Sequence, residues 1–243
     1  MSALAAATRA AVDGYWAEVF GCHPAELRPS RPVVLPRPPA GGEYHGAQLQ
    51  SFGAAPLALL PPPLVGRYRA PLAAAMEGGL AADGRWAAVF GGHVGKVIGP
   101  AEVWYADAET FRPPAESAAR LLGPDDLGAV DALRRACDPL EWEHGGSTPG
   151  PHPAAGVFVD GALAALAGYQ LWDRRLAHLS IVTHPAHRGR GHGAAAVAAL
   201  VPEAMARGLV PQYRALSGNA ASLAIARRLG FAPHSVGLAV RFR

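Results

Sequence analysis

The sequence predicts an α+β protein, and three observations lead to this fold class. Hairpin signals follow one another between residues 156 and 183, with Asp160-Gly161 as the strongest, and they predict antiparallel strands. A glycine-rich turn then joins an apolar strand ending at Val182 to an alanine-rich helix over residues 194–207. Further helices are predicted from apolar spacing over residues 3–20, 64–76, 80–90 and 125–136.

Composition limits the class of protein. The chain has 243 residues, half of them apolar, which is enough for one large domain or two small ones. The net charge is only +3, and no basic run is interleaved with aromatics, so we do not expect nucleic acid as a partner. No run of eighteen apolar residues occurs, so we expect no membrane span and a cytoplasmic location.

Metal chemistry is not indicated either. Cys22 and Cys137 stand in no C-x-x-C pair, so neither a disulfide framework nor a thiolate zinc site is predicted. His184, His187 and His192 gather around the glycine-rich turn, but no cysteine or carboxylate stands near them to complete a ligand set. We expect these histidines to line a nucleotide or to face water, and we predict no metal.

The glycine-rich turn has the features of an anion site. In Arg188-Gly189-Arg190-Gly191-His192-Gly193 the glycines let the backbone bring several N–H groups toward one point. The helix that follows adds its unpaired first-turn amides and the positive end of its dipole. This arrangement predicts a phosphate ligand, with Arg188 and Arg190 at the rim of the site. The competing interpretation is that the turn is a solvated, flexible loop.

A dinucleotide fingerprint is a further alternative for the same turn. Gly189, Gly191 and Ala194 satisfy G-x-G-x-x-A. That motif requires an acidic residue about twenty positions later, where this chain has Arg207 and Gly208. Only about fifty residues remain after the turn, too few for the rest of a doubly wound sheet. The nicotinamide interpretation therefore fails.

At these residues the chain resembles the GNAT superfamily of N-acetyltransferases. The family's acetyl-CoA motif, R/Q-x-x-G-x-G/A after a strand, appears as Arg188-x-x-Gly191-x-Gly193. A second signature, an asparagine opening a helix that ends in Gly-Phe, appears from Asn219 to Phe231. The resemblance implies a three-layer α/β/α fold with a mixed, largely antiparallel central sheet in the order βββαβαβ. Its final strand would be residues 235–242.

The resemblance also implies a reaction and a set of cofactor contacts. The reaction is transfer of an acetyl group from acetyl-CoA to a primary amine of a small molecule or peptide, and a homodimer is left open. Pantetheine would meet main-chain atoms of Ile181, Val182 and Thr183. The remaining cofactor contacts implied are Arg188, Gly189, Arg190, Gly191, His192, Gly193, Ala194, Asn219 and Ser222.

The chain departs from the family where catalytic side chains are usually found. Family positions that carry a strand Glu or His fall on Ala177 and Leu179, and the frequent tyrosine acid falls on Ala226. The resemblance places this segment in the wall of the acceptor site, so Glu143, Glu141 and His144 are the candidate bases, and Tyr213 is a candidate proton donor. The alternative for the three candidate bases is that they are solvated loop charges around a core Trp142. Because the usual catalytic positions carry apolar residues, the alternative to an enzyme is a non-catalytic acyl-CoA-binding or regulatory module.

Two domains are predicted, divided in the polar segment 106–114. Residues 113–243 form the GNAT-like domain, and residues 1–112 form an α+β domain without a glycine-rich anion loop of its own. Strands in this domain are predicted at 33–35, 44–52, 57–60, 97–98 and 103–105. It is either a decayed copy of the acetyltransferase fold or a small α+β cap. The cap is favoured because no internal repeat is visible.

Overall fold

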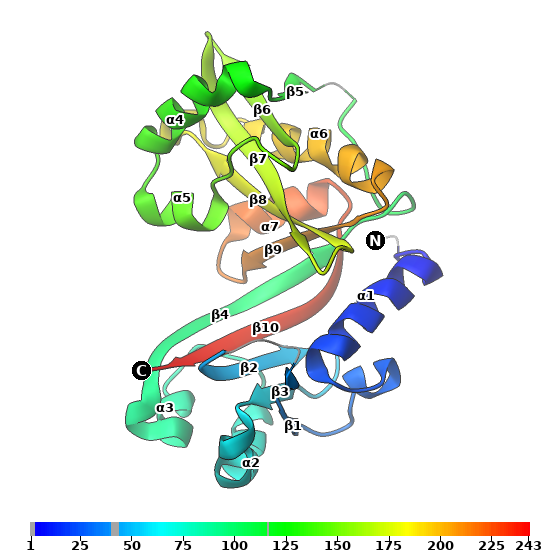
Figure 1. Cartoon of the computed structure of the whole chain (residues 1–243), viewed down its shortest axis with the longest axis vertical. Coiled ribbons are helices and arrows are strands. Elements are labelled where there is room, and N and C mark those ends of the chain that lie inside the picture. Colours follow the sequence, from blue (N-terminus) through cyan, green and yellow to red (C-terminus); the bar gives the residue numbers. More distant parts are fainter. Residues whose placement is uncertain (1–2, 40–43, 116) are drawn as a thin grey trace. The chain divides into compact units, whose positions relative to one another are not determined.

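The computed structural model describes residues 3–39, 44–115 and 117–243 (Figure 1). These residues divide into two compact units. Of the described residues, the C-terminal unit contains those of Tyr105–Arg214 and Ala221–Ala232 together with Ala3 and Leu4. The N-terminal unit contains those of Ala5–Trp104, Ala215–Ala220 and Pro233–Arg243. The sequence placed the boundary at 112/113 and the last strand in the C-terminal sheet, whereas this division places most of that strand in the N-terminal unit.

The ten described strands follow one another in a single hydrogen-bonded order, and the N-terminal unit, which is α+β, contains the first five, β1-β3-β2-β10-β4. Its helical elements are α1 (Ala6–Phe20), η1 (Pro24–Leu27), α2 (Pro62–Met76), α3 (Arg85–Phe90) and η3 (Gly91–His93). Its strands are β1 (Val33–Pro36), β2 (Gly46–Ser51), β3 (Leu57–Leu60), β4 (Val94–Tyr105) and β10 (Ala232–Phe242). The predicted hairpin is the antiparallel pair β2–β3, while β1 runs parallel to β3 at the edge.

Side chains from helices and sheet fill the core of this unit. Trp86 and Phe90 of α3 and Leu72 of α2 are buried against sheet residues such as Leu49 and Val240. On α1, Asp13 receives a bidentate pair of hydrogen bonds from Arg28 (2.9 and 3.0 Å) and lies 2.9 Å from Nε2 of His234. This partly buried polar group joins α1 to β10.

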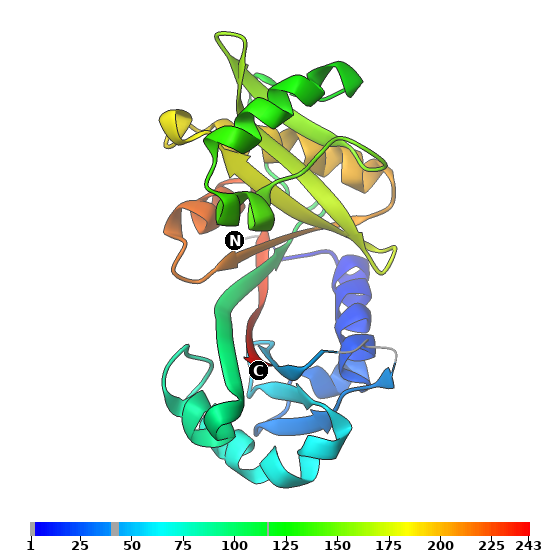
Figure 2. The same cartoon turned by 60° about the vertical axis from the view of Figure 1, so that its left-hand side comes forward.

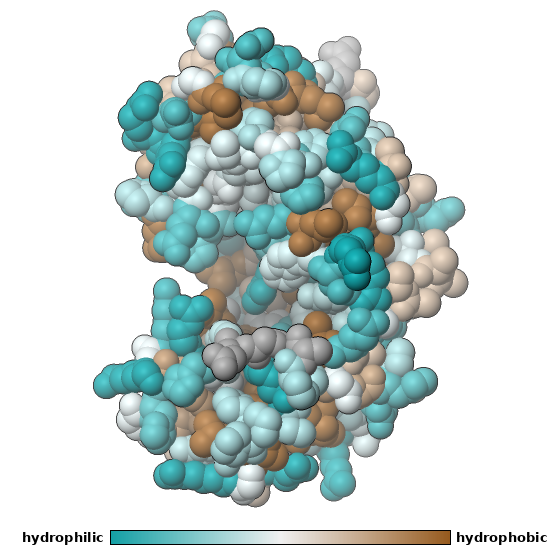
Figure 3. All heavy atoms as spheres, viewed as in Figure 1, coloured by the Kyte–Doolittle hydropathy of each residue, from teal (hydrophilic) through white to brown (hydrophobic). Residues whose placement is uncertain are grey.

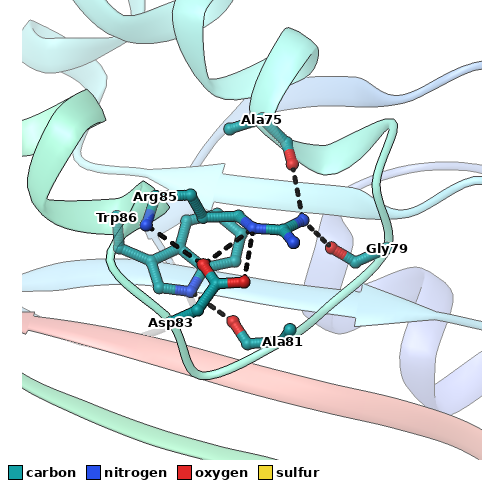
Figure 4. Close-up of polar contacts among 6 residues, drawn as sticks. All are labelled: Ala75, Gly79, Ala81, Asp83, Arg85 and Trp86. Atoms are coloured by element: carbon teal, nitrogen blue, oxygen red, sulfur yellow. Dashed lines mark hydrogen bonds and ion pairs between the residues drawn. The ribbon is translucent and has the colours of Figure 1, made fainter.

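Helix α3 is shorter than predicted, because residues 80–84 wrap around the side chain of Arg85 (Figure 4). The Arg85 guanidinium donates to the carbonyl oxygens of Ala75 (3.2 Å) and Gly79 (3.1 Å) and pairs with Asp83 (2.8 Å). The carbonyl of Ala81 accepts from the Trp86 indole N–H (2.6 Å). The side chains of Arg85 and Trp86 thus donate hydrogen bonds to backbone carbonyl groups in and before this segment, and the helix begins only at Arg85.

The C-terminal unit contains the other five strands of this order, β9-β8-β7-β6-β5. Its strands are β5 (Ala119–Leu121), β6 (Ala154–Val159), β7 (Ala162–Trp172), β8 (Leu176–Thr183) and β9 (Val210–Leu216). Its helical elements are η4 (Pro124–Asp126), α4 (Leu127–Ala136), α5 (Pro139–Gly145), η5 (Pro185–His187), α6 (His192–Ala206) and α7 (Ala220–Arg228). From β6 to β10 the chain follows the expected order βββαβαβ.

Turn chemistry explains the two hairpins of this sheet. Asp160 and Gly161 both have positive φ (50° and 81°), as a two-residue type I′ turn requires. Asp173 and Arg174 repeat this conformation (49° and 55°) between β7 and β8. Strands β6, β7 and β8 are therefore antiparallel neighbours, while β9 pairs with β8 in the parallel sense.

Helices cover both faces of the C-terminal sheet (Figures 1 and 2). On one face α4 packs Val130 and Leu133 against Leu166 and Val182. On the other face lies α6, which buries Val197, Leu200 and Val201 among others. Because side chains alternate along a strand, β8 presents Val182 to α4 and the neighbouring Ile181 and Thr183 to the first turn of α6. The predicted three-layer α+β arrangement is confirmed.

The surface is mainly polar on the face drawn in Figure 3, where hydrophobic residues form separate small areas among hydrophilic ones. Among the described residues, every helix is too short or too polar to cross a lipid bilayer. Both cysteines are free thiols; Cys137 is buried and Cys22 is partly buried.

Candidate functional site

The predicted phosphate loop lies between β8 and α6. Gly189 and Gly191 adopt left-handed φ angles of 75° and 82°, which glycine accepts at little cost. Gly191 is the N-cap of the fifteen-residue α6, and its carbonyl accepts the first helical bond, from Ala195 (3.0 Å). The N–H groups of the first helical turn have no acceptor within the helix. This is the geometry of an anion site at the positive end of a helix dipole.

The third motif glycine lets the helix approach the strand closely. A Cβ at Gly193 would lie 2.9 Å from Cδ1 of Ile181 and 3.0 Å from Oγ1 of Thr183. Any side chain there would push α6 away from β8. The motif Arg188-x-x-Gly191-x-Gly193 therefore combines a left-handed helix cap with a tight helix–strand contact.

Arginines surround the loop. Arg188 lies half exposed and donates from Nε to the carbonyl oxygen of Thr183 (3.3 Å). Arg190 is exposed. A guanidinium that the sequence analysis missed is that of Arg228 in the last turn of α7, whose Nη1 would lie 3.9 Å from a Cβ on Gly191. The cluster of cations suits a ligand with several phosphate charges.

The histidines of the loop form a chain of ring contacts. The ring centroids of His184 and His187 are 5.3 Å apart, and those of His187 and His192 are 6.1 Å apart. Within the described parts of the chain, no group of three His, Cys, Asp or Glu side chains is placed to hold a metal ion.

Next to the loop, β8 and β9 separate. They pair only from Leu176–His178 to Val210–Gln212, although β8 continues to Thr183 and β9 to Leu216. On its other side β8 stays paired with β7 along its whole length. The two parallel strands thus open like a V, with its vertex at His178 and Gln212 and its open end toward the phosphate loop.

Main-chain groups of β8 face this opening. The N–H of Val210 donates to the carbonyl of Arg175 (2.9 Å), so odd-numbered residues of β8 direct their N–H and C=O groups to the β9 side. Ile181 and Thr183 therefore present main-chain donors and acceptors where β9 has diverged. Val182, the third residue expected to contact pantetheine, directs its main chain to β7 and its side chain into the core.

Helix α5, for which no sequence pattern predicted a helix, borders the opening. Its N-terminus is capped by Asp138, whose carboxylate accepts from the N–H groups of Leu140 (2.8 Å) and Glu141 (3.3 Å). At its other end, a Cβ on Gly145 would overlap the carbonyl oxygen of Ile181. The C-terminal end of α5 therefore lies directly against the main chain of β8.

The three candidate bases lie on α5 and differ in their surroundings. Glu141 forms an ion pair with Arg188, with 2.7 Å between Oε2 and Nη2, so its carboxylate is at the phosphate loop. Glu143 is exposed on the same helix. The neighbouring His144 is held by its own helix, through Nδ1 and the carbonyl of Leu140 (2.7 Å).

Tyr213, the candidate proton donor, follows the last β9 residue paired with β8. Its ring is buried against Phe231, and its hydroxyl lies 2.9 Å from that of Ser222 in α7. Burial raises the pKa of the Tyr213 phenol, although the bond to Ser222 acts in the opposite direction. Ser222, expected to contact the cofactor, thus also orients Tyr213. Asn219 lies in the turn before α7 and outside the C-terminal unit.

A cavity of about 300 Å³ lies over β7 and β8 beside α5. Its wall is mostly aromatic, hydroxyl and amide groups: Trp142, Ser147, His152, Tyr169, Gln170 and Ser180. The side chain of Ser147 lies directly on Gly168 of β7, where a Cβ would overlap it. A small polar molecule fits this volume.

An opening between parallel strands beside a glycine-rich turn at a helix N-terminus suits a long, phosphate-bearing ligand. Residues 120–231 match the model of the Acetyltransferase (GNAT) family. The chain thus contains a GNAT acetyltransferase domain at residues 120–231, and acetyl transfer from acetyl-CoA is the chemistry of that family. Comparison with curated proteins gives no match.

Solved structures similar to this chain include several proteins of the same family. A GNAT-family protein from Novosphingobium aromaticivorans is 28% identical, with 60% of this chain and 65% of that chain aligned and a TM-score of 0.47. A GNAT acetyltransferase from Colwellia psychrerythraea is 16% identical, with 65% and 61% aligned and a TM-score of 0.48. YncA of Salmonella typhimurium, solved with its cofactor acetyl-CoA, is 18% identical, with 52% and 94% aligned and a TM-score of 0.39. This chain thus spans less than two thirds of the first two relatives.

Proposed function

We propose that the protein is an N-acetyltransferase that moves the acetyl group of acetyl-CoA to a primary amine of a small molecule or peptide. The observation that carries this proposal is the separation of β8 from β9 directly beside the phosphate loop. The loop from Arg188 to Gly193 would hold the diphosphate through main-chain N–H groups, with Arg190 and Arg228 at its rim. Ile181 and Thr183 would hydrogen-bond the pantetheine arm.

The acceptor would bind in the cavity between α5 and the sheet. An alkylammonium with a pKa near 10.4 is free base in only about one part in 2,500 at pH 7, so its deprotonation costs about 4.6 kcal/mol. We propose that the Glu143 carboxylate accepts this first proton from the ammonium group, directly or through one water. The amine nitrogen then bonds to the acetyl carbon, the carbon–sulfur bond breaks, and the nitrogen loses its second proton as the sulfur gains one.

Tyr213 would assist departure of the thiolate. Its raised pKa keeps the hydroxyl protonated at neutral pH, and Ser222 fixes its position near the vertex of the opening. A phenol held there can donate a hydrogen bond to the developing negative charge on sulfur. Correct placement of the two reactants would supply much of the remaining rate enhancement.

A thermal-shift experiment tests the cofactor assignment. Ligand at a hundred times its dissociation constant adds about 2.7 kcal/mol of stability, so CoA and acetyl-CoA should raise the melting temperature while NADH should not. An unchanged melting temperature in saturating acetyl-CoA would refute the assignment.

The second candidate is a non-catalytic acyl-CoA-binding or regulatory module. The observation that favours it is that Ala177, Leu179 and Ala226 are buried apolar residues at the positions where relatives carry titratable side chains. Release of free CoA in the presence of a panel of amines separates the two. Turnover with any amine supports the enzyme, whereas acetyl-CoA binding without turnover across a broad panel supports the module.

A further inference from the structure

The ion pair between Glu141 and Arg188 joins the helix beside the acceptor cavity to the loop that would bind the cofactor. The two residues are 47 positions apart in sequence, and their charged atoms lie 2.7 Å apart. Their side chains remain 47% and 49% exposed, so water and other anions can reach them. An exposed pair of this kind is weak and exchanges readily.

A phosphate would compete for the same guanidinium. Arg188 follows Pro185–His187 and precedes the glycines of the loop, and its Nε is fixed on the carbonyl of Thr183. Only one of its Nη groups contacts Glu141, whereas a phosphate offers several oxygens and a larger charge to the planar fork. The carboxylate and a bound diphosphate would also repel each other.

Helix α5 links the Glu141–Arg188 ion pair to the cavity, because other residues of this helix form part of the cavity wall. Trp142, the next residue after Glu141, lines the cavity, and so does Gly146 at the far end of the helix. Between them, Gly145 lies against the carbonyl of Ile181, an atom that faces the opening between β8 and β9. Release of Glu141 from Arg188 would therefore loosen the helix that forms both the cavity wall and one border of the opening.

We propose that Glu141 is an internal competitor for the cofactor phosphate: it holds α5 on Arg188 in the free protein and gives up this contact when acetyl-CoA binds. Glu141 is then a positioning residue of α5 rather than the base. The acceptor cavity takes its final shape only after the cofactor has displaced Glu141. This inference rests on the proposed function, because it requires phosphate at the loop.

Calorimetry with acetyl-CoA and no acceptor tests the competition. Glu141→Gln should raise the affinity about two- to fivefold, which is the range that loss of one exposed ion pair allows. Glu143→Gln, on the same helix, is the matched control and should leave the affinity unchanged. Equal or weaker binding by Glu141→Gln would overturn the proposal, and weaker binding would show that Glu141 orients Arg188 for the phosphate.

Amide hydrogen exchange provides a readout that does not depend on activity. In the wild type, acetyl-CoA should speed exchange in residues 139–146, whereas in Glu141→Gln this segment should exchange fast even without acetyl-CoA. Slower exchange of the wild-type segment on binding would contradict the release of α5. If neither protein binds acetyl-CoA at all, the proposed function fails, and that result is distinct from binding with unchanged α5.

Discussion

The imidazole Nδ1 of His178 lies 2.6 Å from Oε1 of Gln212, at the last register position that β8 and β9 share. The Nε2 of Gln212 in turn donates to the hydroxyl of Tyr105 (2.7 Å), so His178 carries its proton on Nδ1. The His178 ring also stacks on Trp172, with centroids 3.9 Å apart. These contacts fix the vertex from which the two strands diverge.

His178 should make the protein less stable in mild acid. Burial lowers its pKa to about 4, although the bond to Gln212 acts in the opposite direction. Since an unfolded histidine titrates near 6.5, only the unfolded state takes up the proton as the pH falls from 6.5 to 4. Stability is therefore lost over that range, by on the order of 3 kcal/mol in total, and is unaffected by this group above pH 7.

Urea unfolding at several pH values measures this effect. His178→Gln should be less stable than the wild type at pH 7, yet its stability should fall less steeply between pH 6.5 and 4. Burial also lowers the pKa of His234, which both proteins retain. His234 should therefore contribute the same remaining pH dependence of stability to both. Identical slopes in the two proteins would show that His178 does not control this titration.

Gly191 should be essential for acetyl-CoA binding. Gly191→Ala would strain a left-handed residue (φ 82°) and place a methyl group beside the first-turn N–H groups that we propose to bind the diphosphate. Each lost charge-assisted bond is worth about 1.5–3 kcal/mol, so affinity should fall at least tenfold in calorimetry.

Gly208→Ala is the matched control for this change. Gly208 also has a left-handed φ (73°), with open space around it, but it ends α6 instead of starting it. Both variants carry the same kind of backbone strain, and only Gly191→Ala should lose affinity. Equal binding by both folded variants would show that this loop is not the phosphate site.

Tyr213→Phe should slow turnover and leave cofactor binding intact. The change removes the hydroxyl next to Ser222 but keeps the ring against Phe231, whose centroid is 5.5 Å away. We expect kcat to fall about 100-fold, which is the lower end of the range for loss of a general acid. Ser222→Ala should lower kcat less, and an unchanged kcat in Tyr213→Phe would place the donor elsewhere.

Glu143→Gln should also lower kcat with little change in the affinity for acetyl-CoA, because an amide cannot take the ammonium proton. The loss should be smaller at high pH, where more of the acceptor amine is already free base. Glu141→Gln is the comparison, since its carboxylate pairs with Arg188. Wild-type rates for Glu143→Gln across the pH range would show that the base lies elsewhere.

Local signals explain the parts of the fold that could be predicted. The Asp160-Gly161 turn fixes the β6–β7 hairpin, and the left-handed glycines Gly189 and Gly191 fix the turn between β8 and α6, because both depend on residues close in sequence. Helix α5 was missed because it spans only seven residues among glycines and prolines and depends on one cap, that of Asp138. Strand β5, with three residues, offers even less pattern.

Contacts between distant residues could not be predicted from the sequence. Glu141 and Arg188 meet across 47 residues, and His178 and Gln212 across 34, because the sheet brings their elements together. No periodicity or turn signal encodes such a pair. This is why the sequence could identify the two glutamates as candidates but could not show that Glu141, and not Glu143, pairs with Arg188.

The last prediction concerns Arg228. No sequence motif indicates this residue, and it is a candidate because its guanidinium lies near Gly191. Arg228→Gln should weaken acetyl-CoA binding about 5- to 50-fold, through loss of one charge-assisted contact in a partly exposed site, and should reduce the salt dependence of binding. Arg227→Gln is the matched control, since it removes the same charge from the same helical turn on a different face. Calorimetry at two salt concentrations measures both effects. A similar loss in both variants would mean that the general positive charge of α7 matters, and a loss in neither would remove Arg228 from the site.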